Sequence, residues 1–251
     1  MGIILELKDL TKAYDTYAVV DHLNLQVNEG ELRCLIGPNG AGKTTTMDLI
    51  TGRQKTTGGQ VIFDGRNITG LKEHMIVRRG IGRKFQVPAV FKDLTVRENI
   101  EVAFNRNPDP FANMLMMFRR TDKARFDEIV DLIGLGERLG ERAGYLSHGE
   151  TQWLEIGMVL TQNPRLLLMD EPTAGMTEQE THKTSQIFNR LRGSHTLVVV
   201  EHDMTFVREI ADVISVLHMG KLLAQGTMAE VENDPKVREV YLGAEGISDA
   251  T

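Results

Sequence analysis

The sequence predicts a single α/β domain built on a buried parallel sheet, with a helical segment inserted in its middle. Short apolar runs alternate with helical patterns, which is typical of parallel strands covered by helices. A glycine-rich loop stands between one of these runs and a helix, and residues 87–160 carry helical patterns only. The chain has 251 residues, enough to bury a full core without disulfides or structural metals.

The first 86 residues are predicted to form strands and one helix. Ile3–Leu7 and Leu23–Val27 show the apolar alternation of half-buried strands, and Gln60–Phe63 is a further strand followed by an Asp-Gly turn. Leu32–Ile36 leads into the glycine-rich loop. A helix then carries Met47, Leu49 and Ile50, and Gly52 is placed to end it.

The second half returns to alternating strands and helices. Strands are expected at Leu166–Met169, Leu197–Val200 and Val213–Leu217, with helices from Thr177 and near Phe206–Ala211. Because these strands are short and wholly apolar, we expect them to be buried on both faces of one sheet.

The middle of the chain contains several sequence signals for helices. Thr95–Glu98 and Ser147–Glu150 are S/T-x-x-E capping boxes, and Asp122–Ile133 has apolar residues at helical spacing. No repeat or flexible linker separates the parts. We therefore expect one domain over 1–251, with a core lobe of 1–86 and 161–251 and a helical lobe of 87–160.

Composition excludes several classes of protein. The chain has 29 Lys+Arg and 35 Asp+Glu, a net charge of −6, so it lacks the basic character of a general nucleic-acid binder. One cysteine, Cys34, allows neither an internal disulfide nor a cysteine zinc site, and it is expected to be a buried small apolar residue. No apolar run reaches the roughly 18 residues of a membrane span, and no signal peptide is evident. A cytosolic globular protein is predicted.

The glycine-rich loop carries the strongest chemical signal. Residues 37–44 fit G-x-x-x-x-G-K-[ST] between a strand and a helix, where backbone N–H groups and the helix N-terminus bind phosphate. Lys43 supplies a positive charge for the β- and γ-phosphates, and the Thr44 hydroxyl is suited to Mg²⁺. The predicted nucleotide-binding residues here are Gly37, Pro38, Asn39, Gly40, Ala41, Gly42, Lys43, Thr44 and Thr45.

Two further strands end in reactive side chains. Asp170 and Glu171 follow Leu166–Met169, and His202 follows Leu197–Val200. Ligands of open α/β sheets bind at the carboxyl ends of the strands, so these groups are expected to meet at the phosphate loop. Asp170 is then a candidate Mg²⁺ ligand, and Glu171 a candidate to polarise the attacking water.

With these residues in order, the chain resembles the ATP-binding cassette (ABC) ATPases over nearly its whole length. Leu146–Glu150 stands where the family has its signature, Phe85-Gln86 where it has its Q-loop, and His202 where it has its switch histidine. Tyr14 occupies the position of the aromatic residue that stacks on adenine, with Tyr17 as an alternative.

This resemblance implies a P-loop NTPase (RecA-like) core with an antiparallel β subdomain and an inserted α-helical subdomain. It also implies ATP and Mg²⁺ as cofactors, with Thr44, Gln86 and Asp170 at the metal. Glu171 would be the general base, His202 would contact the γ-phosphate, and Gln86 would sense the membrane partner. Cassettes of this family pair head to tail, so Ser147, His148, Gly149 and Glu150 would bind ATP held by a second subunit.

Two departures from the family pattern bear on that pairing. His148 and Glu150 replace the usual Gly and Gln of the signature, and Thr177 replaces the Asp that usually ends the loop after Glu171. Thr177 can still cap the following helix. The missing Asp favours a heterodimer with a more standard sister cassette, although a homodimer stays open.

Local resemblances suggest the transported solute. Val237–Gly243 looks like the C-terminal segment of ATPases from branched-chain amino-acid and urea-type importers. Within that group, the sequences at 146–149, 152–158 and 174–177 look most like the urea-importer ATPase. We therefore expect an ATP-hydrolysing importer subunit for urea, with permease partners at the inner face of the cell membrane, and a branched-chain amino-acid importer as the alternative.

A soluble ABC ATPase of translation or DNA repair is less favoured, because the chain has one cassette and no heptad tract. The intact Lys43, Asp170 and Glu171 argue against a binding module without turnover.

Overall fold

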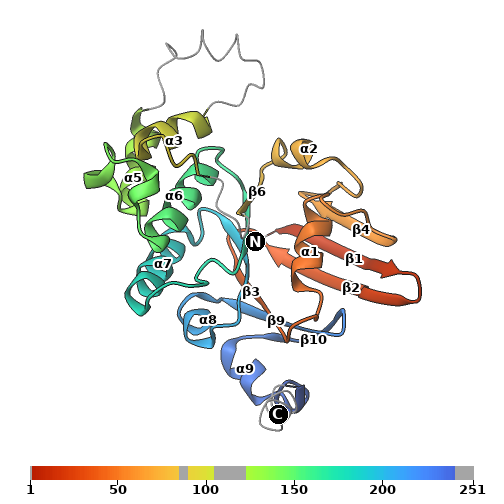
Figure 1. Cartoon of the computed structure of the whole chain (residues 1–251). Coiled ribbons are helices and arrows are strands. Elements are labelled where there is room, and N and C mark those ends of the chain that lie inside the picture. The colour runs from red at the N-terminus through yellow and green to blue at the C-terminus, as the bar shows by residue number, and fades with distance from the viewer. Residues whose placement is uncertain (1, 85–89, 105–122, 241–251) are drawn as a thin grey trace.

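Two β-sheets and a group of helices make up the protein (Figure 1). The computed structural model describes residues 2–84, 90–104 and 123–240. In Figure 1 the six-stranded sheet lies centrally, with the antiparallel sheet to one side and helices α3, α5, α6 and α7 to the other. The predicted α/β class with inserted helices is confirmed.

The N-terminal sheet is antiparallel, with strand order β2-β1-β4-β5. Its strands are β1 (Ile3–Tyr14), β2 (Tyr17–Asn28), β4 (Gly58–Phe63) and β5 (Arg66–Asn67). The first two strands are longer than predicted, because cross-strand pairing continues through several register shifts as far as Tyr14 and Tyr17. Those shifts break the alternation of apolar and polar residues on which the prediction relied.

The second sheet has the order β10-β9-β3-β8-β7-β6. Its strands are β3 (Leu32–Ile36), β6 (Ile81–Lys84), β7 (Leu166–Asp170), β8 (Thr196–Val200), β9 (Val213–His218) and β10 (Lys221–Gly226). All pairs are parallel except β9 with β10. The predicted apolar runs are β3, β7, β8 and β9, whereas β6 and β10 were not predicted as strands. Strands β3, β7 and β8 are buried throughout.

The α-helices are accompanied by two short 3₁₀ turns at Gly136–Arg138 and Ala143–Tyr145, and residues 235–240 are also helical. The helices are α1 (Lys43–Ile50), α2 (Glu73–Val77), α3 (Val96–Phe104), α5 (Lys123–Ile133), α6 (His148–Leu160), α7 (Glu178–Leu191), α8 (Met204–Ile210) and α9 (Met228–Asn233). The capping boxes predicted at Thr95, Ser147 and Thr177 are all formed. No named strand occurs in the described residues of 90–160, although the division into lobes stays a prediction.

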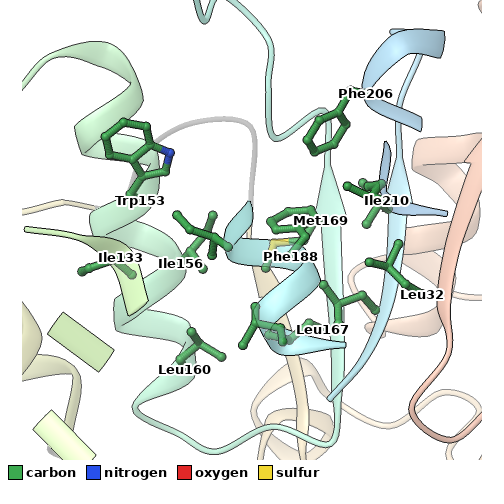
Figure 2. Packing of buried hydrophobic residues seen from close by; sticks show 14 of the residues in the cluster. Leu32, Ile133, Trp153, Ile156, Leu160, Leu167, Met169, Phe188, Phe206 and Ile210 are labelled. Atoms are coloured by element: carbon green, nitrogen blue, oxygen red, sulfur yellow. The ribbon is translucent and has the colours of Figure 1, made fainter. Parts of the chain in front are cut away.

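The central sheet separates two hydrophobic cores. Alternate residues of β7 face opposite sides: Leu167 and Met169 pack in the core with the helices, whereas Leu166 and Leu168 pack in the core with the antiparallel sheet. Figure 2 shows the first core, where Trp153 and Ile156 of α6 lie on one side and Phe188, Phe206 and Ile210 gather around the sheet. The rings of Phe188 and Phe206 meet edge to face at 5.7 Å. Helix α1 belongs to the other core, so α1 and α6 lie on opposite faces of the sheet.

No helix in the part of the chain that the structure describes is long and apolar enough to cross a bilayer.

Candidate active site

The predicted phosphate loop connects the end of β3 to the start of α1. Gly42, which precedes α1, has a left-handed backbone with φ 96°, and a Cβ there would lie 2.6 Å from the carbonyl oxygen of Val19. Gly37 is constrained in the same way, since a Cβ would lie 2.1 Å from Leu217 O. The loop can therefore adopt this path only with glycine at both positions. Asn39, Gly40 and Thr44 are exposed, Pro38 and Thr45 are half-buried, and Ala41 is buried.

Lys43 lies within the curve of this loop. Its Nζ donates hydrogen bonds to the carbonyl oxygens of Gly37, at 2.7 Å, and Pro38, at 3.0 Å. Burial lowers the pKa of the Lys43 ammonium, and the negative charges of Glu171 and Asp170 oppose that effect. The structure thus brings together the lysine and the two carboxylates that were predicted to converge.

Asp170 ends β7 and is 2% exposed. Burial raises the pKa of its carboxyl, while Arg83 and a hydrogen bond from Thr44 act to lower it. Among the described residues, its Oδ1 is buried and has no hydrogen-bond partner. A buried carboxylate oxygen without a donor is costly, and beside a threonine hydroxyl it offers the hard oxygen ligands that Mg²⁺ prefers. These residues fit a magnesium ion.

Arg83 was not predicted as part of the site. Its Nη1 donates to Asp48 Oδ1 at 2.7 Å and to Thr51 at 2.9 Å, and its Nη2 lies 3.7 Å from Asp170 Oδ2. This arginine of β6 therefore connects α1 to the end of β7 through buried contacts. Its position three residues before Gln86 was the only signal in the sequence.

Glu171 and His202 lie beside each other after neighbouring strands. His202 Nδ1 is 3.9 Å from Glu171 Oε1, and the imidazole is 68% exposed. Glu171 has a left-handed backbone, with φ 46°, and its N–H donates to Val200 O. Such a backbone is uncommon for a residue other than glycine and is held here by the sheet. The predicted general base, Glu171, and the predicted switch histidine, His202, thus lie beside each other.

Glu201 is a second residue that the sequence left without a role. It is fully buried and accepts hydrogen bonds from Thr173 N at 3.1 Å, Thr173 Oγ1 at 2.6 Å and His202 N at 3.1 Å. It thereby ties the loop after Glu171 to the end of β8. Only its position between a buried strand and His202 could have drawn attention to it.

Glu201→Ala is expected to destabilise the protein by about 1–3 kcal/mol, because it leaves buried donors unpaired. Chemical denaturation would measure the change against Glu178→Ala, which removes an exposed carboxylate at the start of α7. Equal unfolding midpoints for the two variants would show that Glu201 does not hold the loop.

Tyr14 lies at the exposed end of β1. Its hydroxyl donates to Gln54 Oε1 at 2.7 Å, and Lys12 Nζ lies 4.7 Å from the ring centroid. Tyr17 is opposite Tyr14 in the strand register and is also exposed. The proposed contact of Tyr14 with adenine stays a prediction, and Gln86 lies outside the described residues.

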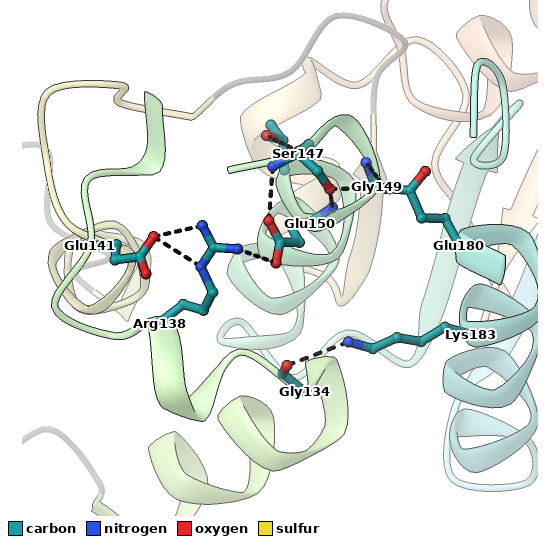
Figure 3. A network of polar contacts seen from close by, with 9 residues as sticks. Gly134, Arg138, Glu141, Ser147, Gly149, Glu150, Glu180 and Lys183 are labelled. Carbon is teal, nitrogen blue, oxygen red and sulfur yellow. Dashed lines mark hydrogen bonds and ion pairs between the residues drawn. The ribbon is translucent and has the colours of Figure 1, made fainter. Parts of the chain in front are cut away.

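The signature residues begin α6, on the other face of the sheet from α1. Ser147 caps the helix, and Glu150 completes the box by accepting from Ser147 N at 2.8 Å (Figure 3). Arg138 holds the other oxygen of Glu150 at 2.7 Å. His148 Nε2 lies 2.9 Å from Ala174 O, so the unusual signature residue contacts the loop after Glu171. Helix α6, which begins with this segment, and helix α1, which follows the phosphate loop, pack in different cores.

A phosphate loop that meets an acidic strand end at the edge of a parallel sheet defines a P-loop NTPase. Comparison with known protein families identifies the family within the P-loop NTPases. The family model described as "ABC transporter" matches residues 20–174, and one described as "Branched-chain amino acid ATP-binding cassette transporter" matches 221–247. The chain belongs to the ABC transporter family and is one of its ATP-hydrolysing cassettes, as the sequence indicated.

Known relatives extend over almost the whole chain. A high-affinity branched-chain amino-acid transport ATP-binding protein of Pseudomonas aeruginosa, BraF, is 37% identical over 249 residues, which cover 96% of this chain and 98% of that protein. The corresponding protein LivG of Salmonella typhimurium is 36% identical with the same coverage. A solved ATP-binding cassette in its ADP conformation superposes with a TM-score of 0.83 at 30% identity, covering 97% of this chain and 100% of that one.

Proposed function

We propose that this chain is the ATP-hydrolysing subunit of a membrane importer, in which pairing of two cassettes around ATP drives solute uptake. The observation that supports it best is the convergence of Lys43, Asp170 and Glu171 at one edge of the central sheet. Similarity to importer ATPases along nearly the full chain agrees with the same assignment.

Each residue of the site has a proposed task. Lys43 and the N–H groups of the loop bind the β- and γ-phosphates, and Tyr14 stacks on the adenine. Glu171 accepts a proton from the attacking water, while His202, 3.9 Å away, contacts the γ-phosphate. Magnesium bound by Asp170, Thr44 and Gln86 would supply positive charge to the phosphates during transfer.

The second half of each site comes from another cassette. Ser147 and Gly149 place a hydroxyl and an N–H at the start of α6, the kind of helix terminus that binds anions. Since α6 and α1 lie on opposite faces of the sheet, these donors would serve ATP on a partner. The loss of Asp at Thr177 favours a heterodimer. Integral-membrane permease subunits complete the assembly, which places this chain peripherally at the cytoplasmic face.

The identity of the transported solute is a separate part of the proposal. The relatives named above are branched-chain amino-acid transport proteins, and they support that class. The contact of His148 with Ala174 O joins two of the segments on which the urea prediction rested, which retains urea as a second candidate. An importer ATPase for either solute would belong to the same group of importers.

Uptake into vesicles separates these candidates. The cassette would be reconstituted with its permease and solute-binding subunits, with radiolabelled urea or leucine outside and Mg-ATP on the cassette side. We expect ATP-dependent uptake of one solute by the wild type and none by Glu171→Gln. Uptake of urea or of leucine alone would identify the substrate. Uptake of neither, with ATP hydrolysis intact, would contradict both proposed solutes.

A further inference from the structure

One carboxylate joins the starts of two helices. Glu180, in the first turn of α7, accepts hydrogen bonds through Oε1 from Ser147 Oγ at 2.8 Å and from Gly149 N at 3.2 Å (Figure 3). Its Oε2 accepts from Thr177 N at 3.0 Å and Thr177 Oγ1 at 3.1 Å. The residue therefore caps its own helix with one oxygen and the signature helix with the other.

The signature segment accommodates this carboxylate closely. A Cβ at position 149 would lie 2.5 Å from Glu180 Cδ and 2.6 Å from Oε1, so the approach requires glycine there. The hydrogen bond from Thr177 N, followed by those from Ser147, Thr177 Oγ1 and Gly149, lowers the pKa of Glu180. The group is an anion at neutral pH, seated on donors that themselves favour anions.

Ser147 Oγ and Gly149 N cannot each donate a hydrogen bond to two acceptors at once. A serine hydroxyl and a backbone N–H each carry one hydrogen to donate, and both hydrogens point to Glu180 Oε1. The proposed function assigns the same two donors to the γ-phosphate of ATP on a partner. A phosphate oxygen brought to these donors would also be repelled by the carboxylate already there.

We propose that Glu180 is the internal occupant of the anion site formed by Ser147 and Gly149, and that its carboxylate must leave before the γ-phosphate of a partner's ATP can bind. This inference rests on the proposed function, because it requires pairing of two cassettes across the signature. It makes Glu180 a restraint on that pairing and not only a helix cap.

Release of Glu180 needs no separation of the helices. Trp153 Nε1 of α6 donates to Thr184 Oγ1 of α7 at 2.9 Å, and Lys183 Nζ lies 3.7 Å from the Trp153 ring centroid. These contacts keep α6 and α7 together below the signature. Rotation of the Glu180 side chain can therefore free Ser147 and Gly149 while the two helices stay packed.

Pairing driven by Mg-ATP tests the inference. Glu180→Ala would be combined with Glu171→Gln, which slows hydrolysis, and pairing of this chain with itself and with the sister cassette of the same importer would be followed by sedimentation as ATP is added. We expect half-maximal pairing at a roughly tenfold lower ATP concentration than with Glu171→Gln alone, because a charged competitor for two donors is removed. Glu180→Gln keeps an acceptor without the charge and should give a smaller gain.

Glu230→Ala in the same background is the matched control. Glu230 forms the same capping box with Thr227 at the start of α9, with Thr227 N at 2.7 Å. If Glu180→Ala pairs at the same ATP concentration as this control, or at a higher one, the inference is overturned. If no variant pairs, either with itself or with a sister cassette, although each monomer binds ATP, the proposed site between subunits fails as well. That outcome differs from the one in which the variants pair but Glu180→Ala needs as much ATP as the control.

Discussion

Glu171→Gln is expected to lower the ATPase rate by about 10²–10⁴-fold while leaving ATP binding intact, because the amide cannot accept a proton from the attacking water. The substitution preserves the size of the side chain and the backbone hydrogen bond to Val200 O. Without hydrolysis, ATP-bound cassettes should also stay paired longer. Steady-state phosphate release and a nucleotide-binding titration would measure the two effects.

Glu178→Gln provides the control for this experiment. Glu178 is an exposed carboxylate at the start of α7, seven positions along the chain and outside the contacts described for the site. It should hydrolyse ATP at the wild-type rate. Similar rates for Glu171→Gln and the wild type would remove Glu171 as the general base and direct attention to His202.

The parts of the fold that the sequence predicted depend on local rules. Buried parallel strands need apolar residues on both faces, so Leu166–Met169 and Leu197–Val200 could be recognised from composition alone. Capping boxes span four residues, so Ser147–Glu150 and Thr177–Glu180 were visible in the sequence and are formed in the structure. The glycine loop is similarly local.

The missed contacts join residues far apart in the chain. Arg83 and Asp48 are 35 positions apart, Ser147 and Glu180 are 33 apart, and Thr173 and Glu201 are 28 apart. No periodicity links such pairs, since the packing of one element against another decides which polar groups meet. Glu180 shows this most clearly: its helix cap was predictable, whereas its contact with the signature depends on where α6 lies.

These distant contacts also connect the two halves of the proposed cycle. The loop after Glu171 touches the signature through His148 and Ala174, and ends at Thr177, which shares Glu180 with Ser147. These contacts form a continuous path within one subunit from the loop after Glu171 to the donors that would face the partner's ATP.

Asp170→Asn is expected to reduce Mg²⁺-dependent hydrolysis by roughly 10²-fold or more, since it replaces a buried anionic ligand with a neutral amide. Arg83 keeps its 2.7 Å ion pair with Asp48 in this variant, so the fold should be retained. Asp48→Asn is the matched control: it weakens the pairing of Arg83 but leaves Asp170 and Thr44 in place. We expect it to lower the unfolding midpoint while the Mg²⁺ concentration for half-maximal activity changes little. An equal rise in that concentration for both variants would mean that Asp170 acts by holding Arg83 and not by binding the metal.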